Sequence, residues 1–153
     1  MRSHAVLERT VAKQREELGR ESGSMQQVVV DSDVVIDFTR KASSFLRTLF
    51  ELSAQKKIKL FIPSAVVAEL VAGQETKDKE NFKDLEILLN KLEFVVLNYN
   101  LSKKTGELLR DYRELDLGDA IVAASCLSLN AKLATRNLKD FADIDNLRFF
   151  KMK

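Results

Sequence analysis

Cysteine and histidine, which often carry zinc binding and acid–base catalysis, are almost missing from this sequence. The one cysteine, Cys126, excludes an internal disulfide and a cysteine zinc site. The one histidine, His4, lies in the N-terminal tail, so a multi-histidine metal site or a Ser-His-Asp triad is nearly excluded. If the protein is an enzyme, carboxylates, hydroxyls or lysines have to carry its chemistry.

Long apolar runs and a strong net charge are also missing. No apolar run reaches the ~18 residues that a membrane span needs, and the first residues lack the apolar core of a secretory signal. We therefore expect a cytoplasmic protein without a membrane segment. A net charge of +2 is too small to indicate a nucleic-acid partner by itself.

The chain of 153 residues is expected to hold one folded domain, residues 25–153, which is long enough to bury a core. Residues 1–24 have a thin apolar stripe and end in the flexible join ESGS. We interpret them as an appended or flexible segment, either vector-derived or a loosely docked helix. A helix that binds a partner is the alternative.

Within the domain, apolar patterns alternate between strands and helices. Strands are predicted at residues 27–30, 58–62, 94–97, 132–135 and 147–150; helices are predicted at 34–40, 44–55, 64–72, 81–92, 102–115 and 118–130. This alternation predicts an α/β fold with a mainly parallel sheet and helices on both of its faces.

The stretch VVVDSDVVIDF, residues 28–38, places an acid where a buried strand ends. In open α/β sheets, ligand sites lie at the carboxyl ends of strands, which favours a functional role for Asp31. The alternative is a helix N-cap. Ser32 and Asp33 could each cap the helix without Asp31, so both interpretations stay open.

Two further acids lie among apolar residues of predicted helices. The helical neighbours of Glu69 are small or apolar, so we expect its carboxylate to be partly buried or to line a cleft. No base lies within one turn, and a cation would be its natural partner. Asp119 follows Gly118 at the start of an apolar helix, where capping or stabilisation by the helix dipole is a strong alternative.

Asp140 follows the strand predicted at residues 132–135. It could either cap a turn or reach back toward the end of that strand. A doubly wound sheet would bring all four acids to one edge, where they would repel one another without a cation. Mg²⁺ or Mn²⁺ bound by carboxylates and water would resolve the repulsion and would suit phosphodiester hydrolysis.

Three stretches resemble the motifs of the PIN-domain family, specifically the VapC-like toxins of prokaryotic toxin–antitoxin pairs. VVVDSDVVIDFTR resembles the first motif, with an acid ending a strand. PSAVVAELVAG resembles the second, with its glutamate on a helix. LGDAIVAASCLSLNAKLATRNLKDF resembles the third and fourth together. The order and spacing of these motifs match across nearly the whole domain.

The resemblance implies a three-layer α/β/α sandwich with a short sheet of four or five strands, and an Mg²⁺- or Mn²⁺-dependent endoribonuclease. It implies that Asp31, Glu69 and Asp119 bind the metal. The fourth acid is open, because some family members have Asp where this chain has Asn137. We favour Asp140. Residues that would hold these acids or contact the substrate are Ser32, Asp33, Thr135 and Asn137.

VapC-like toxins are usually homodimers, and a small antitoxin covers their acidic groove, so the resemblance implies both partners. RNA also requires cations near the acids, because phosphate contacts dominate its affinity. Arg40, Arg136 and Lys139 lie next to the motifs and are our candidates. We interpret Asp37 as structural, in a helical ion pair with Lys41.

Three other functions compete with the toxin. The first is a PIN nuclease of RNA processing or decay, without an antitoxin. The second is an inactive PIN-like module that binds RNA or protein. The third is a phosphoacceptor receiver domain, which needs an acid after its middle strand. The strand FVVL is instead followed by Asn98, Tyr99 and Asn100, which counts strongly against a receiver.

Overall fold

Val28, Val29 and Val30 form the centre of the fold. They belong to β1 (Gln26–Val30), and all three side chains are completely buried. A computed structural model describes residues 25–151, and the predicted N-terminal segment, residues 1–24, lies outside the described residues.

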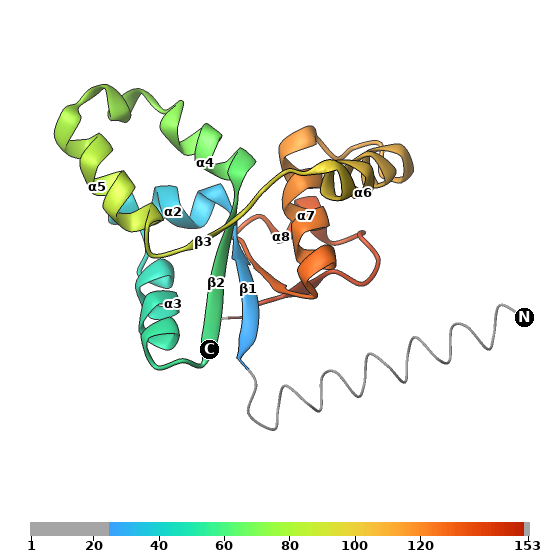
Figure 1. The fold of residues 1–153 in the computed structure, drawn as a ribbon, viewed down its shortest axis with the longest axis horizontal. Helices are drawn as coiled ribbons and strands as arrows, with labels where there is room; N and C mark the ends of the chain where they lie inside the picture. The colour runs from blue at the N-terminus through green and yellow to red at the C-terminus, as the bar shows by residue number, and fades with distance from the viewer. Residues whose placement is uncertain (1–24, 152–153) are drawn as a thin grey trace, which may run out of the picture.

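The described residues form a parallel five-stranded sheet. Its order is β3 (Glu93–Val95), β2 (Ile58–Pro63), β1, β4 (Lys132–Ala134) and β5 (Arg148–Phe149). Each strand pair in this order is parallel. The carboxyl ends of the strands therefore share one edge, and β1 and β2 point upward toward it in Figure 1.

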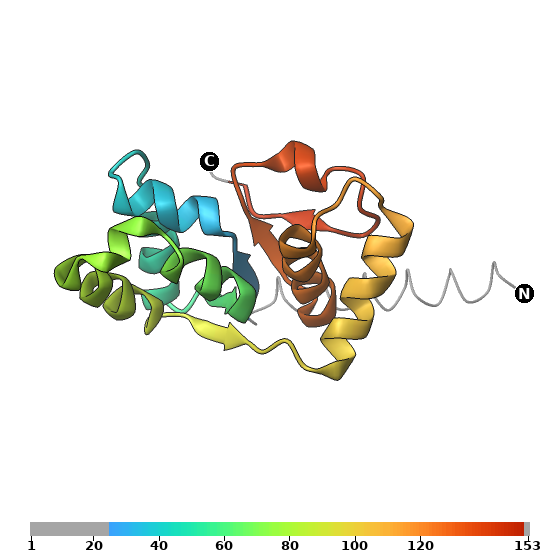
Figure 2. The ribbon, with the colours of Figure 1, turned by 90° about the horizontal axis from the view of Figure 1, so that it is seen from above.

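Helices cover both faces of the sheet, so the predicted α/β/α sandwich is confirmed. Figure 2 shows the two helical layers with the sheet between them. One layer holds α2 (Ser32–Thr39), α3 (Phe45–Ala54), α4 (Ser64–Val71), a 3₁₀ turn (Gln74–Lys77) and α5 (Lys79–Leu89). The other holds α6 (Tyr99–Asp111), α7 (Leu117–Leu129) and α8 (Leu138–Phe141).

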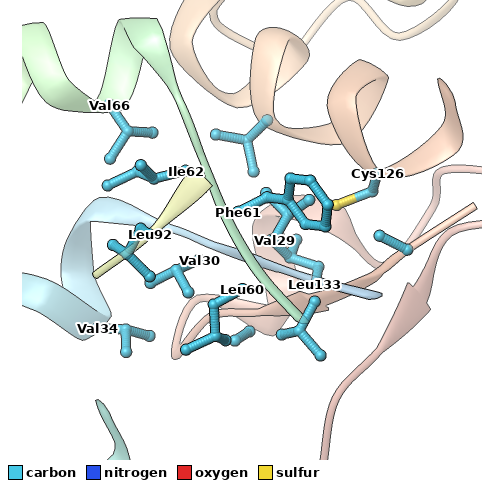
Figure 3. Close-up of a cluster of buried hydrophobic side chains, with 14 of the residues drawn as sticks. Val29, Val30, Val34, Leu60, Phe61, Ile62, Val66, Leu92, Cys126 and Leu133 are labelled. Carbon is cyan, nitrogen blue, oxygen red and sulfur yellow. The ribbon is translucent and has the colours of Figure 1, made fainter. Parts of the chain in front are cut away.

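The core lies between the sheet and these two layers (Figure 3). Phe61 of β2 and Cys126 of α7 both belong to this core. Cys126 is a buried core thiol, and its burial raises the pKa of the thiol. Within the described part of the chain, no helix is long and apolar enough to cross a membrane.

At α5 and α6, side-chain caps place the helix start before its predicted position. Asp78 accepts hydrogen bonds from the backbone N–H groups of Glu80 and Asn81, so α5 begins at residue 79 and not at residue 81. Asn98 caps α6 in the same way, and that helix begins three residues before the predicted start at residue 102. The apolar periodicity misses both first turns because their residues are mostly polar and exposed.

Candidate active site

Asp31 ends β1 and starts the turn into α2. Its Oδ1 accepts a hydrogen bond from the Ser32 backbone N–H at 2.8 Å, and its Oδ2 accepts one from the Thr135 hydroxyl at 3.0 Å. The residue is only 5% exposed. Burial, followed by the charge of Asp33, raises the pKa of Asp31 to about 6. Asp31 is thus the N-cap of α2, but an N-cap does not need to be buried, so capping alone does not explain its position.

Thr135 connects the end of β4 to two acids. Its hydroxyl lies 3.0 Å from Asp31 Oδ2 and 3.3 Å from Asp33 Oδ2, and its single proton is shared between them. The same hydroxyl accepts a hydrogen bond from the Asn137 backbone N–H at 3.1 Å. Thr135 therefore holds Asp31 through its hydroxyl, and the backbone N–H of Asn137 in turn holds that hydroxyl.

Asp33 binds the loop after β4 and does not hold Asp31 directly. Its Oδ2 accepts a hydrogen bond from the Arg136 backbone N–H at 2.9 Å. Its Oδ1 is buried and has no hydrogen-bond partner among the described residues. Burial raises the pKa of Asp33. Ser32 acts on Asp31 through its backbone N–H.

Asp119 lies in the first turn of α7. Its backbone N–H donates to the Asp116 carboxylate at 2.8 Å, so the N-cap of α7 is Asp116. The predicted alternative that Asp119 itself caps the helix is therefore wrong. Burial, Asp116, Asp31, Asp140 and Glu69, in that order, raise the pKa of Asp119 to about 6.

Glu69 lies on α4, which packs against α7. Of the two predicted situations for this residue, burial is excluded, because Glu69 is exposed. Its neighbours on α4 face the core instead, with Val66 and Leu70 buried. The Glu69 carboxylate nevertheless raises the pKa of both Asp31 and Asp119, so it belongs to the same electrostatic cluster.

Asp140 reaches the cluster from the short helix α8, where it is exposed. Its charge contributes to the raised pKa of Asp119, which favours the alternative that it reaches back toward the strand ends. The four acids thus come from four segments, and the charges of Asp31, Asp140 and Glu69 all act on Asp119. Within residues 25–151, no group of three or more His, Cys, Asp or Glu side chains has a geometry that could hold a metal ion.

Comparison with known families identifies this arrangement. The sequence model of the PIN domain matches residues 28–147, which include all four acids. The chain belongs to the PIN-domain family. The resemblance stated from the sequence motifs is therefore confirmed.

Relatives of this PIN domain include two ribonucleases. Ribonuclease VapC2 of Rickettsia felis is 29% identical over 125 residues, which cover 78% of this chain and 92% of the relative. Ribonuclease VapC10 of Mycobacterium tuberculosis is 28% identical over 125 residues, which cover 79% of this chain and 90% of the relative.

Solved structures show the same PIN-domain fold. The VapBC2 complex of Rickettsia felis, bound to a fragment of promoter DNA, matches with a TM-score of 0.72 and 25% identity, over 84% of this chain and 100% of that chain. DNA-bound VapBC of Salmonella typhimurium matches with a TM-score of 0.70 and 22% identity, over 82% of this chain and 98% of that chain.

The cations predicted to contact RNA differ in how far their charges are neutralised within the PIN domain. Arg136 Nη1 lies 2.7 Å from Asp37 Oδ2, and Arg40 Nη2 lies 3.1 Å from Glu75 Oε1. Lys139 is exposed and makes no ion pair within the described residues. Lys139 therefore has the most available charge of the three, and it lies next to Asp140.

Two residues of the PIN domain have roles that were not predicted. Asp37 pairs with Arg136, so the predicted helical pair with Lys41 is wrong; α2 ends at residue 39, and Lys41 lies beyond it with a left-handed φ of 56°. Asp116 caps α7. An acid three residues before Asp119 was the available signal, because an N-cap side chain bonds the third helical residue.

Proposed function

We propose that this PIN domain is a metal-dependent endoribonuclease that hydrolyses RNA phosphodiesters, and that it is the toxin of a VapBC-type toxin–antitoxin pair. The observation that carries the proposal is the electrostatic cluster of acids: after burial and the charge of Asp116, the charges of Asp31, Asp140 and Glu69 all raise the pKa of Asp119. The names of the two ribonuclease VapC relatives support the same reaction.

The chemistry of the side chains in the cluster is suited to Mg²⁺ or Mn²⁺. The side chains of the cluster are carboxylates, which hard divalent cations prefer as ligands. We propose Asp31, Glu69, Asp119 and Asp140 as the ligands. The last three are less buried than Asp31, and they can adjust their rotamers toward an ion with little repacking. A bound cation would neutralise the acids and activate a water molecule for attack on phosphorus.

The protein's own residues would control this site in two ways. Ser32 and Thr135 fix both oxygens of Asp31, so one ligand is oriented before any ion arrives. The raised pKa values of Asp31 and Asp119, both about 6, mean that each carboxyl releases its proton only as the pH approaches neutrality. Cation binding and cleavage should therefore increase through this range and weaken at acid pH.

Cleavage of a mixed panel of structured and single-stranded RNAs tests the reaction. The assay uses Mg²⁺, Mn²⁺ and EDTA, with Asp119→Asn beside the parent chain and Asp84→Asn as a control. Asp84 is an exposed acid of α5 and is not one of the four acids of the cluster. We expect metal-dependent cleavage by the parent and the control only.

Two results would contradict the nuclease. Equal cleavage by Asp119→Asn and the parent chain would mean that the activity does not come from this site. No cleavage by the folded parent, together with no binding of Mn²⁺ in calorimetry, would favour a module that only binds RNA or protein.

The proposed antitoxin is a small protein encoded next to this one. The VapBC2 complex of Rickettsia felis supports such a partner. The adjacent small protein should co-purify with this chain and inhibit its cleavage of RNA. Lack of both effects would favour a PIN nuclease of RNA processing. We place either activity in the cytoplasm, where its RNA substrate would be found.

We also propose a homodimer. Phe94, Val96, Leu97 and Tyr99 are 51%, 65%, 41% and 80% exposed along the edge strand β3 and the chain after it. Isolated apolar side chains are ordinary on a surface, but a continuous group of this kind is typical of an interface. Light scattering should give a dimer for the parent chain and a monomer for Val96→Asp. A parent monomer would refute the proposal.

A further inference from the structure

Gly118 occupies the first turn of α7 although its backbone does not need a glycine. The residue is helical, and its φ is outside the left-handed region. Alanine is much more favourable than glycine in a helix. Among the atoms around a side chain placed at this position, the nearest is a carboxylate oxygen of Glu69.

A Cβ atom at position 118 would collide with the Glu69 carboxylate. It would lie 2.6 Å from Glu69 Oε1 and 3.8 Å from Glu69 Cδ. Because Glu69 is exposed, its long side chain can rotate away from an added methyl group without disturbing the core. A substitution at Gly118 should therefore displace Glu69 while leaving the fold intact.

We infer that Gly118 is a positioning residue for Glu69. The missing side chain leaves room for the carboxylate to lie against the first turn of α7, next to Asp119. The positive end of the helix dipole stabilises a carboxylate at this place and offsets part of the repulsion between the two acids. The inference rests on the proposed metal site, in which Glu69 and Asp119 share one ion.

Gly118→Ala and Gly106→Ala form a matched pair for the test, each made in the full chain. Gly106 also lies in a helix, α6, but a Cβ atom there would meet nothing within 4 Å. Both variants should melt at or above the temperature of the parent, because alanine favours the helix. Only Gly118→Ala should lose Mn²⁺ affinity in calorimetry, by about 10- to 100-fold, as when the support of a metal ligand is removed.

A double-mutant cycle separates positioning from a general structural role. If Gly118 acts through Glu69, then Gly118→Ala should weaken Mn²⁺ binding no further once Glu69→Gln is present. Independent, additive losses would overturn the inference. An equal loss of affinity in Gly106→Ala would overturn it too, because that variant cannot touch Glu69.

A crystal structure of Gly118→Ala without metal gives a readout that does not depend on the proposed function. We expect the Glu69 carboxylate to have left its place beside α7. A carboxylate that stays there would overturn the inference, whether or not the parent binds Mn²⁺. A parent that binds no Mn²⁺, with Glu69 displaced in the variant, would instead refute the metal site and uphold the positioning by Gly118.

Discussion

Replacing Asp31 with Asn should stabilise the metal-free protein while abolishing its activity. Asp31 is almost fully buried, and its pKa rises from 3.8 to about 6 in the folded chain. A shift of about two units corresponds to about 3 kcal/mol of destabilisation once the carboxyl is ionised. Asparagine removes the charge, and the weakening of one hydrogen bond would cost about 1 kcal/mol. The net gain at neutral pH is therefore about 2 kcal/mol.

The sign of the effect depends on pH in a defined way. The folded state holds the Asp31 proton more tightly than the unfolded state does. The penalty is therefore absent below the ordinary pKa of 3.8, grows as the pH rises, and is complete above the folded pKa of about 6. The advantage of Asp31→Asn over the parent should appear across this same window and disappear at acid pH.

Urea unfolding in EDTA, at several pH values across the window, measures this difference. Asp84→Asn provides the control, because it removes the charge of an exposed acid on α5 in place of a buried one. Added Mn²⁺ should stabilise the parent but not Asp31→Asn. A variant that is less stable than the parent by the same amount at acid and neutral pH would refute the reasoning, because the charge of Asp31 would then have no energetic role.

Three further substitutions test other parts of the site. Thr135→Val removes a hydrogen bond that lowers the pKa of Asp31, so the acid limb of the pH–rate profile with Mn²⁺ should move to higher pH; an unmoved limb would contradict this role. Lys139→Ala should weaken RNA binding and reduce the salt dependence of the affinity by about one charge, measured by fluorescence anisotropy; an unchanged salt slope would exclude a phosphate contact. Asp116→Ala should lower stability by about 1 kcal/mol through loss of the helix cap. The same change should lower the pKa of Asp119, because the Asp116 charge raises it. NMR titration of the carboxylates measures this pKa, and an unchanged value would contradict the role of Asp116.

The sequence was enough to predict the sheet and to single out three candidate acids, because their signals are local. A run of β-branched residues marks β1 as buried on both faces, and Asp31 follows it directly. Glu69 and Asp119 were recognisable as acids among apolar helical residues. Each of these patterns involves only a few neighbouring positions. The order and spacing of the family motifs connect the patterns across the domain.

Contacts between segments that are distant in the sequence could not be predicted from such local patterns. The ion pair of Arg136 with Asp37 joins residues 99 positions apart. The helical spacing in the sequence had instead indicated Lys41 as the partner of Asp37. Likewise, the exposure of Glu69 depends on how α4 is tilted against α7. The close approach to Gly118 depends on the same packing. The spacing of residues in the sequence predicts neither the exposure of Glu69 nor its approach to Gly118.

The hydrogen bond between Thr135 and Asp31 spans 104 positions of the chain, and this has a consequence during synthesis. The ribosome makes β1 early, but β4, its neighbour in the sheet, is made near the end. A nascent chain that stops before β4 has a central strand with one unpaired edge and an acidic cluster without Thr135, Asn137 or Asp140. Such long-range pairing forms late. Incomplete chains should therefore be harmless to RNA beside the ribosome, and the hydrolytic site should be complete only in a nearly finished molecule.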